Sequence, residues 1–81
     1  MISCEHHDNI EIVCMYSYRI RLTLGSGEKL EGIAVDTGRN QSREECIKIR
    51  DESSDHLVVL DSITIMEVLV ENPHFNIVSF K

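Results

Sequence analysis

The stretch Tyr-Arg-Ile-Arg-Leu-Thr-Leu, residues 18–24, decides the fold of this chain. Apolar and polar side chains alternate along it, so Ile20 and Leu22 fall on one face of an extended chain and the arginines fall on the other. The glycine-rich segment 25–27 follows directly and is typical of a tight turn. We therefore predict a strand over 18–24 that pairs as a hairpin with a second strand over 28–37.

Further short strands are expected towards the carboxyl end. We place them at about 44–50, 56–60, 62–69 and 75–80. Gly32, inside the second strand, is the expected place for a bend or bulge. Five or six short strands at even spacing favour a mainly β fold, a small closed or nearly closed antiparallel barrel, because closure removes the exposed sheet edges.

A short helix is predicted before the first strand, from Asp8 to about Tyr16. Ile10, Val13 and Cys14 have the spacing of a single helix face, and Asp8 can cap the amino end. Such a short helix is marginal alone, so its apolar stripe must pack on the sheet. The residues expected to be buried in the resulting core are Ile10, Val13, Cys14, Tyr18, Ile20, Leu22, Leu24, Ile47, Ile49, Val59, Ile63, Ile65 and Val78.

Length and composition predict one globular domain over residues 1–81. With 81 residues, 42% hydrophobic and 27% charged, the chain has the balance of an ordinary soluble protein. No apolar run approaches the roughly 20 residues that span a bilayer, and the first eight residues do not have the pattern of a secretory signal. We expect a cytoplasmic protein that does not contact a membrane.

The charge distribution favours a basic partner. The formal net charge is −6. Residues 1–16 and 51–80 contain Asp and Glu but neither Lys nor Arg, and every basic residue except Lys81 lies between Arg19 and Arg50. An acidic surface repels phosphate and attracts basic proteins. The alternative is an acidic face that only keeps the protein soluble.

Catalytic and metal-binding patterns are weak. Cys4, His6, His7 and Cys14 are zinc-compatible residue types, but their spacing matches no common framework and neighbouring histidines would point apart. Cys14 with His56 or His74 would make a nucleophilic pair only with an orienting group and a pocket. Segment 25–27 is a turn and not a phosphate loop. We expect no catalytic residue, no bound metal and no cofactor.

Binding of single-stranded RNA is the runner-up function, because small barrels preceded by a helix often bind single strands. Such sites need a basic groove and stacking aromatics. Arg19 and Arg21 can form a small basic patch, but the acidic flanks oppose it. The helix offers the competing surface. Glu5, Asp8 and Glu11 can present carboxylates that take the place of phosphates in a basic groove.

Several segments resemble one known family, the Rho-binding antiterminators (the Rof or YaeO proteins). Residues 2–14, Ile-Ser-Cys-Glu-His-His-Asp-Asn-Ile-Glu-Ile-Val-Cys, resemble its opening. Segments 22–24, 27–30 and 34–36 resemble its first hairpin, and Leu-Asp-Ser-Ile-Thr at 60–64 is similar to a later signature. The likeness covers roughly residues 2–80, and its specificity lies in the order and spacing of the pieces.

The resemblance implies an Sm-like barrel with an amino-terminal helix, related in shape to the RNA chaperone Hfq. It also implies an inhibitor of transcription termination that binds the factor Rho and keeps RNA out of Rho's primary RNA-binding sites. We expect a monomer, because the carboxylates over 51–71 discourage edge pairing between copies. The residues expected to contact Rho are Glu5, His7, Asp8, Asn9 and Glu11 on the helix, with Arg43 and Glu44 from the adjoining loop.

Overall fold

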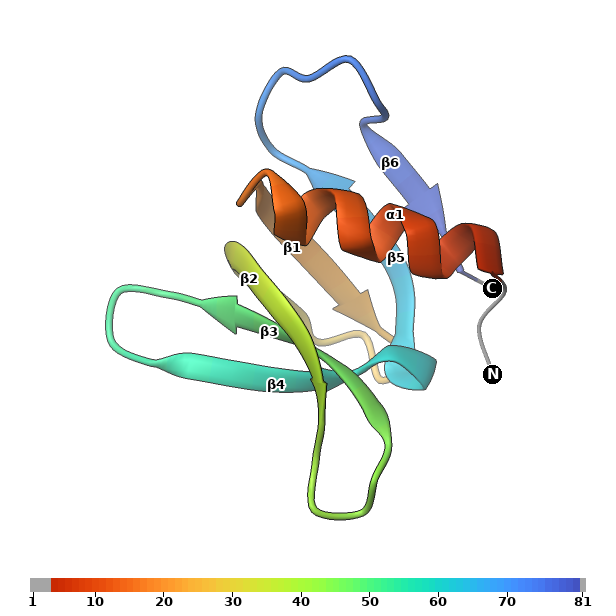
Figure 1. Ribbon diagram of the computed structural model, residues 1–81, viewed down its shortest axis with the longest axis vertical. Coiled ribbons are helices and arrows are strands. Elements are labelled where there is room, and N and C mark those ends of the chain that lie inside the picture. The colour runs from red at the N-terminus through yellow and green to blue at the C-terminus, as the bar shows by residue number, and fades with distance from the viewer. Residues whose placement is uncertain (1–3, 81) are drawn as a thin grey trace.

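The computed structural model describes residues 4–80, in which one α-helix is followed by strands (Figure 1). No helix in this part of the chain is long and apolar enough to cross a membrane. The elements are α1 (Cys4–Met15), β1 (Arg19–Leu24), β2 (Lys29–Arg39), β3 (Glu45–Arg50), β4 (Asp55–Val59), the 3-10 helix η1 (Leu60–Ser62), β5 (Ile63–Val68) and β6 (Ile77–Ser79).

The strands form one antiparallel sheet in the order β4-β3-β2-β1-β5-β6. The mainly β class, the six strands and the amino-terminal helix are therefore confirmed. We expected a closed or nearly closed barrel, and the sheet is not closed. Its end strands β4 and β6 do not pair with each other, so the sheet is open.

The predicted first hairpin is present, with Ile20 opposite Gly32 and Leu22 opposite Leu30. The amide of Leu24 donates to the carbonyl of Glu28 at 2.8 Å and closes the turn. Gly27 in this turn has a φ of 93°, a backbone conformation that residues with a side chain rarely adopt. The turn chemistry of the sequence thus fixes the register of β1 on β2.

Strand β2 pairs first with β1 and then with β3, and the change takes place around Ile33. A Cβ added at Gly32 would lie 2.7 Å from the carbonyl oxygen of Arg50, so only glycine permits this close approach of the two backbones. The bulge expected at Gly32 instead lies at Val35, where the register shifts between Ala34 and Asp36.

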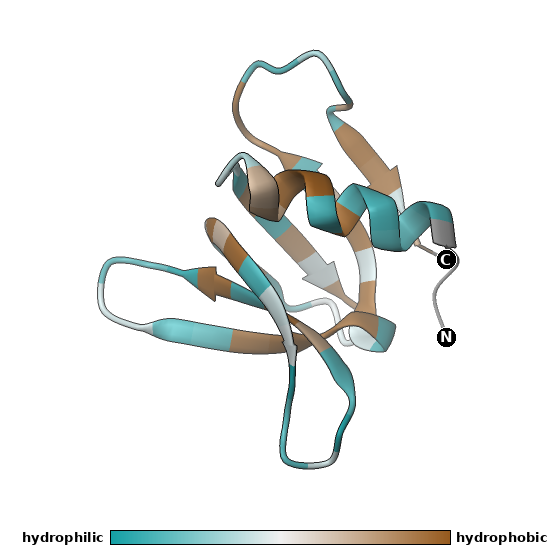
Figure 2. Cartoon of the chain, viewed as in Figure 1, coloured by the Kyte–Doolittle hydropathy of each residue, from teal (hydrophilic) through white to brown (hydrophobic). Residues whose placement is uncertain are grey.

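The core lies between α1 and the concave side of the sheet, and hydrophobic residues line the strands there (Figure 2). Seven of the residues expected in the core are buried: Ile10, Val13, Ile20, Leu22, Ile47, Ile49 and Ile63. The other six, Cys14, Tyr18, Leu24, Val59, Ile65 and Val78, are only half-buried. The buried residues outside that expected set are Ala34, Cys46, Val58, Leu60, Met66, Val68 and Phe80.

Most of these differences come from the second half of the chain. In β5 the register shifts between Thr23 and Leu24 of its partner β1, so Thr64 is an extra residue and the alternation of faces reverses after it. Met66 is therefore buried in place of Ile65. In β4, Val58 lies directly opposite the buried Ile47, which puts Val58 and not Val59 on the core face.

Helix α1 begins at Cys4, one turn earlier than predicted, so Asp8 lies in its second turn and does not cap it. The extra turn has tertiary contacts: the ring centroid of His6 lies 4.7 Å from that of Phe80. The helix ends in a Schellman motif. Ser17 has a φ of 53°, its amide bonds to the carbonyl of Cys14, and the amide of Tyr18 bonds to the carbonyl of Val13. The motif turns the chain directly into β1.

Candidate functional site: helix α1 and the β2–β3 hairpin

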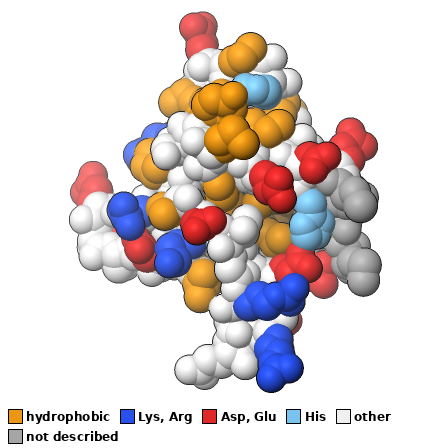
Figure 3. All heavy atoms as spheres, viewed as in Figure 1, with side chains coloured by type: hydrophobic (Ala, Val, Ile, Leu, Met, Phe, Trp, Pro, Cys, Tyr) orange, Lys and Arg blue, Asp and Glu red, His pale blue; other side chains and the backbone are white. Residues whose placement is uncertain are grey.

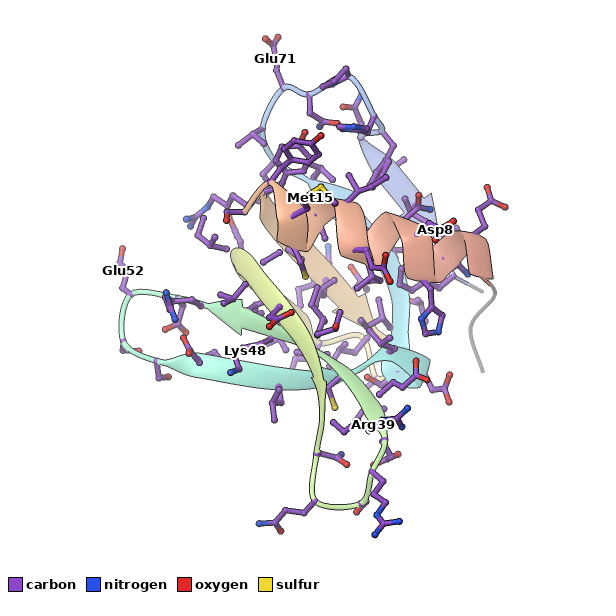
Figure 4. The ribbon with its side chains drawn as sticks, viewed as in Figure 1. Asp8, Met15, Arg39, Lys48, Glu52 and Glu71 are labelled. Carbon is purple, nitrogen blue, oxygen red and sulfur yellow. The ribbon has the colours of Figure 1, made fainter. Side chains whose placement is uncertain are left out.

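The outer face of α1 carries the acidic side chains that the sequence singled out. Glu5, Asp8 and Glu11 are exposed, whereas Ile10 and Val13 are buried against the sheet. Figure 4 shows Asp8 on the solvent side of the helix, and Figure 3 shows acidic side chains gathered over this region. The packing of the apolar stripe therefore fixes which side of the helix a partner meets.

The predicted helix residues do not share one face, because successive residues on a helix are about 100° apart. His7 and Glu11 line a shallow pocket of ≈ 240 Å³ between α1 and the β2–β3 hairpin. Glu5 and Asn9 line a separate depression on the β6 side of the helix. Asn9 is half-buried there.

The loop of the β2–β3 hairpin, residues 40–44, is held by one side chain and is named the Asn40 loop below. The Oδ1 atom of Asn40 accepts the amides of Ser42 at 2.9 Å and Glu44 at 3.0 Å. Its Nδ2 atom donates to Oε1 of Glu44 at 3.0 Å. These bonds give the segment one defined conformation, in which Arg43 has a φ of 65°.

A chain of polar contacts joins the Asn40 loop to the helix. Nη1 of Arg39 donates to the carbonyl oxygen of Arg43 at 2.8 Å. Nη2 of Arg39 lies 3.6 Å from Oε1 of Glu45, the residue directly opposite it across the hairpin. Oε2 of Glu45 lies 3.0 Å from Nε2 of His7 on α1. Because a carboxylate carries no donor, this contact is favourable only when Nε2 of His7 carries a hydrogen.

The structure thus places six of the seven predicted binding residues in three groups, with Asp8 apart from them on the solvent side of α1. His7 and Glu11 face the hairpin, Glu5 and Asn9 lie on the other flank of α1, and Arg43 and Glu44 lie in the Asn40 loop. Arg39, Asn40 and Glu45 adjoin these groups and were not among the predicted residues. Period-two alternation contained the signal for one of them, because it puts Glu45 on the same strand face as the core residues Ile47 and Ile49, and thus towards the helix.

The arginines of the alternative RNA-binding surface are already paired. Arg19 lies 3.5 Å from Glu31, and Arg21 lies 3.8 Å from Glu31 and 3.6 Å from Glu67. These pairs are at most half-buried and therefore weak, but they place acidic side chains beside both arginines. Arg19 also lines a pocket with Arg50, and the acidic Asp51 and Glu52 line the same pocket.

The candidate chemical groups are occupied by structural contacts. Burial, with the nearby carboxylates of Asp36 and Glu11, raises the pKa of the Cys14 thiol to about 11, so it stays protonated at neutral pH and is a poor nucleophile. His56 bonds to Asp51 at 2.6 Å and His74 bonds to Tyr18 at 3.1 Å. Within residues 4–80, no group of three or more His, Cys, Asp or Glu side chains is arranged to hold a metal ion.

A helix laid across an open antiparallel sheet, with an ordered hairpin loop beside it, defines a class of small β proteins that present a surface and not a deep cleft. The chain belongs to the ROF family: residues 1–80 match the family model described as "Modulator of Rho-dependent transcription termination (ROF)". This match confirms the resemblance seen in the sequence. A comparison with curated proteins gave no match.

One solved structure is very similar to this chain over almost its whole length. It is described as "YaeO bound to Magnesium from Vibrio cholerae O395" and is 42% identical in sequence. The alignment covers 91% of this chain and 96% of that one, with a TM-score of 0.89. The open sheet with its amino-terminal helix is therefore an architecture that this chain shares with a solved relative.

Proposed function

We propose that this protein binds the termination factor Rho, blocks RNA from Rho's primary RNA-binding sites, and so acts as an antiterminator. The family is one of regulators of Rho-dependent termination, and the similar solved structure carries the name YaeO. The proposed mechanism is competition by binding, without catalysis. A cytoplasmic location follows, because the proposed partner acts on nascent transcripts.

The observation that carries the proposal is the exposed acidic face of a helix that is anchored on the sheet. Asp8 and Glu11 reach solvent while Ile10 and Val13 lie in the core at 1% and 0% exposure. Charges on an anchored element lose little conformational freedom on binding. A surface that binds RNA phosphates carries basic groups, and carboxylates on such a helix can pair with them by charge-assisted hydrogen bonds.

The proposed binding unit is a monomer that does not itself bind nucleic acid. β6 covers the second edge of β5, and the remaining edge strands are short. β4 begins with the charged Asp55, which discourages pairing between copies. Light scattering of the purified protein should give the 9.3 kDa mass of one chain.

The proposal is tested by reversing one charge on the helix, Glu11→Lys. If α1 enters a basic site on Rho, the substitution replaces an attraction by a repulsion, and losing one partner of a desolvated charge pair costs roughly 2–5 kcal/mol. The affinity for Rho should fall about 30-fold or more. Binding of the parent protein should also weaken with salt, since exposed charges are screened over about 10 Å at 0.1 M.

The matched control is Glu52→Lys, at the tip of the β3–β4 hairpin, far from α1 (Figure 4). Both variants change the net charge equally, so a general charge effect would weaken both. We expect less than about a threefold change for Glu52→Lys and unchanged circular dichroism for both. Equal Rho affinity of Glu11→Lys and the parent protein would contradict the proposed interface. Tight binding of labelled RNA without Rho would favour the alternative function.

A further inference from the structure

A chain of three contacts joins helix α1 to the Asn40 loop. Among the residues that the structure describes, no other part of the β2–β3 hairpin makes an equivalent link. The chain runs from the carbonyl oxygen of Arg43 to Arg39, from Arg39 to Glu45, and from Glu45 to His7. The distances are 2.8, 3.6 and 3.0 Å. Two surfaces that lie far apart in the sequence are thereby fixed relative to each other.

Exposure shows that this chain of contacts contributes little to folding. The side chains of His7, Glu45 and Arg39 are 37%, 45% and 62% exposed. Exposed pairs of this kind change stability only slightly. Their geometry, however, joins two elements that the core alone does not bring together, because the Asn40 loop extends past the last core residues of β2 and β3.

We infer that Arg39 and Glu45 are positioning residues that fix the base of the Asn40 loop relative to α1, so that helix and loop present one composite surface to the partner. The inference rests on the proposed function and adds which residues contact the partner and which act indirectly. Asp8 and Glu11 contact the partner, whereas His7 acts through Glu45. Fixing the loop before binding removes an ordering cost that the complex would otherwise bear.

This role sets an upper limit on the effect of breaking the contacts. Preorganisation can raise the affinity for a partner only by the factor by which it raises the fraction of molecules in the binding-competent state. Because an exposed pair holds the loop weakly, His7→Leu and Glu45→Leu should each reduce Rho affinity by about twofold to fivefold. The double variant should lose no more than one single variant, because both remove the same link.

The conservative variant His7→Gln separates positioning from mere packing. A glutamine amide nitrogen can donate to the carboxylate of Glu45, which lies 3.0 Å from Nε2 of His7, so His7→Gln should restore most of the affinity that His7→Leu loses. If both variants lose affinity equally, the polar contact with Glu45 is not the cause. A loss beyond about tenfold in His7→Leu would mean that His7 itself contacts Rho, and either result would overturn the inference.

The contact itself is tested without Rho. In isotope-labelled protein, His7→Leu should shift the amide signals of Arg39 and Glu45, and Glu45→Leu should shift the signals of His7. Shifts confined to the sequence neighbours of each substitution would overturn the inference while leaving the proposed function intact. Conversely, failure of the parent protein to bind Rho would refute the proposed function whatever these spectra show.

A matched pair on the other hairpin serves as the control. Nε of Arg50 lies 2.8 Å from Oδ1 of Asp55, in an exposed pair of the same type that does not touch α1. Asp55→Leu should leave Rho affinity unchanged within about twofold. An equal loss of affinity in Asp55→Leu and Glu45→Leu would show that any broken surface pair has this effect, and would overturn the specific role of Glu45.

Discussion

The two loops at the ends of β3 use the same local chemistry with different results. In the Asn40 loop, one Asn oxygen accepts two following amides. In the loop of residues 51–54, named the Asp51 loop, Oδ1 of Asp51 accepts the amides of Ser53 at 2.8 Å and Ser54 at 2.9 Å. The flanking charges differ: those of the Asn40 loop reach α1 through Glu45, whereas Asp51 bonds to His56 within its own hairpin.

This difference teaches which hairpin belongs to the candidate site. A loop that closes on itself can be altered without moving the helix, and Glu52 lies at the far tip of this hairpin (Figure 4). A loop that is tied to the helix transmits a change. Local turn chemistry, which is the same at both ends, does not distinguish them; the contact of Glu45 with His7 does.

The largest effect on stability should come from a substitution in β3, the strand that the two hairpins share. Ile47, in the middle of β3, is fully buried and lies opposite Thr37 on one side and Val58 on the other. Ile47→Ala should reduce the free energy of unfolding by about 2–5 kcal/mol, a large share of what so small a domain has. Urea denaturation measures the loss.

Both loops should lose protection from amide hydrogen exchange together in Ile47→Ala, since their common strand is destabilised. Leu57→Ala on β4 is the control, because this leucine is 49% exposed and should cost less than about 1 kcal/mol. If Ile47→Ala loosened only one hairpin, β3 would not be the shared support that the comparison requires.

A smaller effect should separate the two ends of β3. A Cβ at Gly32 would meet the carbonyl oxygen of Arg50, next to the Asp51 loop, at 2.7 Å. Gly32→Ala should therefore cost about 1–3 kcal/mol and shift the amide signals around Arg50 more than those of the Asn40 loop. Gly38→Ala is the matched control in the same strand, since a Cβ there meets nothing within 4 Å. Equal melting temperatures for the two variants would show that the backbones are not in close contact at Gly32.

How far the sequence predicts this fold depends on whether a pattern is local. Alternation over residues 18–24 and the following turn residues predicted the first hairpin correctly, because side-chain period and turn chemistry act within a few residues. The bulge at Thr64 could not be predicted this way. It depends on pairing with β1, more than forty residues away in sequence. The open sheet could not be predicted either, since it depends on whether the end strands β4 and β6 meet in the folded chain.

The candidate site shows the same limit. The acidic residues of α1 could be identified from charge and from the family resemblance, and the exposure of Asp8 and Glu11 agrees with this. The start of the helix could not, because its first turn is held by contacts of His6 and His7 with distant residues. Nor could the link from Glu45 to His7 be identified, since it requires knowing how the hairpin lies against the helix.

The smallest expected effect distinguishes the two loops by their response to acid. The backbone amides of Ser53 and Ser54, with His56, hold the pKa of the Asp51 carboxyl well below its ordinary value. The side-chain amide of Asn40, in contrast, has no charge to lose. A folded-state pKa that is lowered stabilises the protein above the unfolded-state value of about 3.9, and this stabilisation is lost as the pH falls through the folded-state pKa.

Between neutral pH and about pH 4 neither loop should respond through these two residues, and below about pH 4 only the Asp51 loop should. The amide signals of Ser53 and Ser54 should titrate with a midpoint below the ordinary Asp value, while the amide of Ser42 should show no such step. Asp51→Asn should abolish the step and keep the loop folded, because the amide oxygen still accepts both bonds. If the amide signal of Ser53 instead titrates with a midpoint at the ordinary Asp pKa, the carboxylate of Asp51 does not hold its loop in the way that Asn40 holds the Asn40 loop.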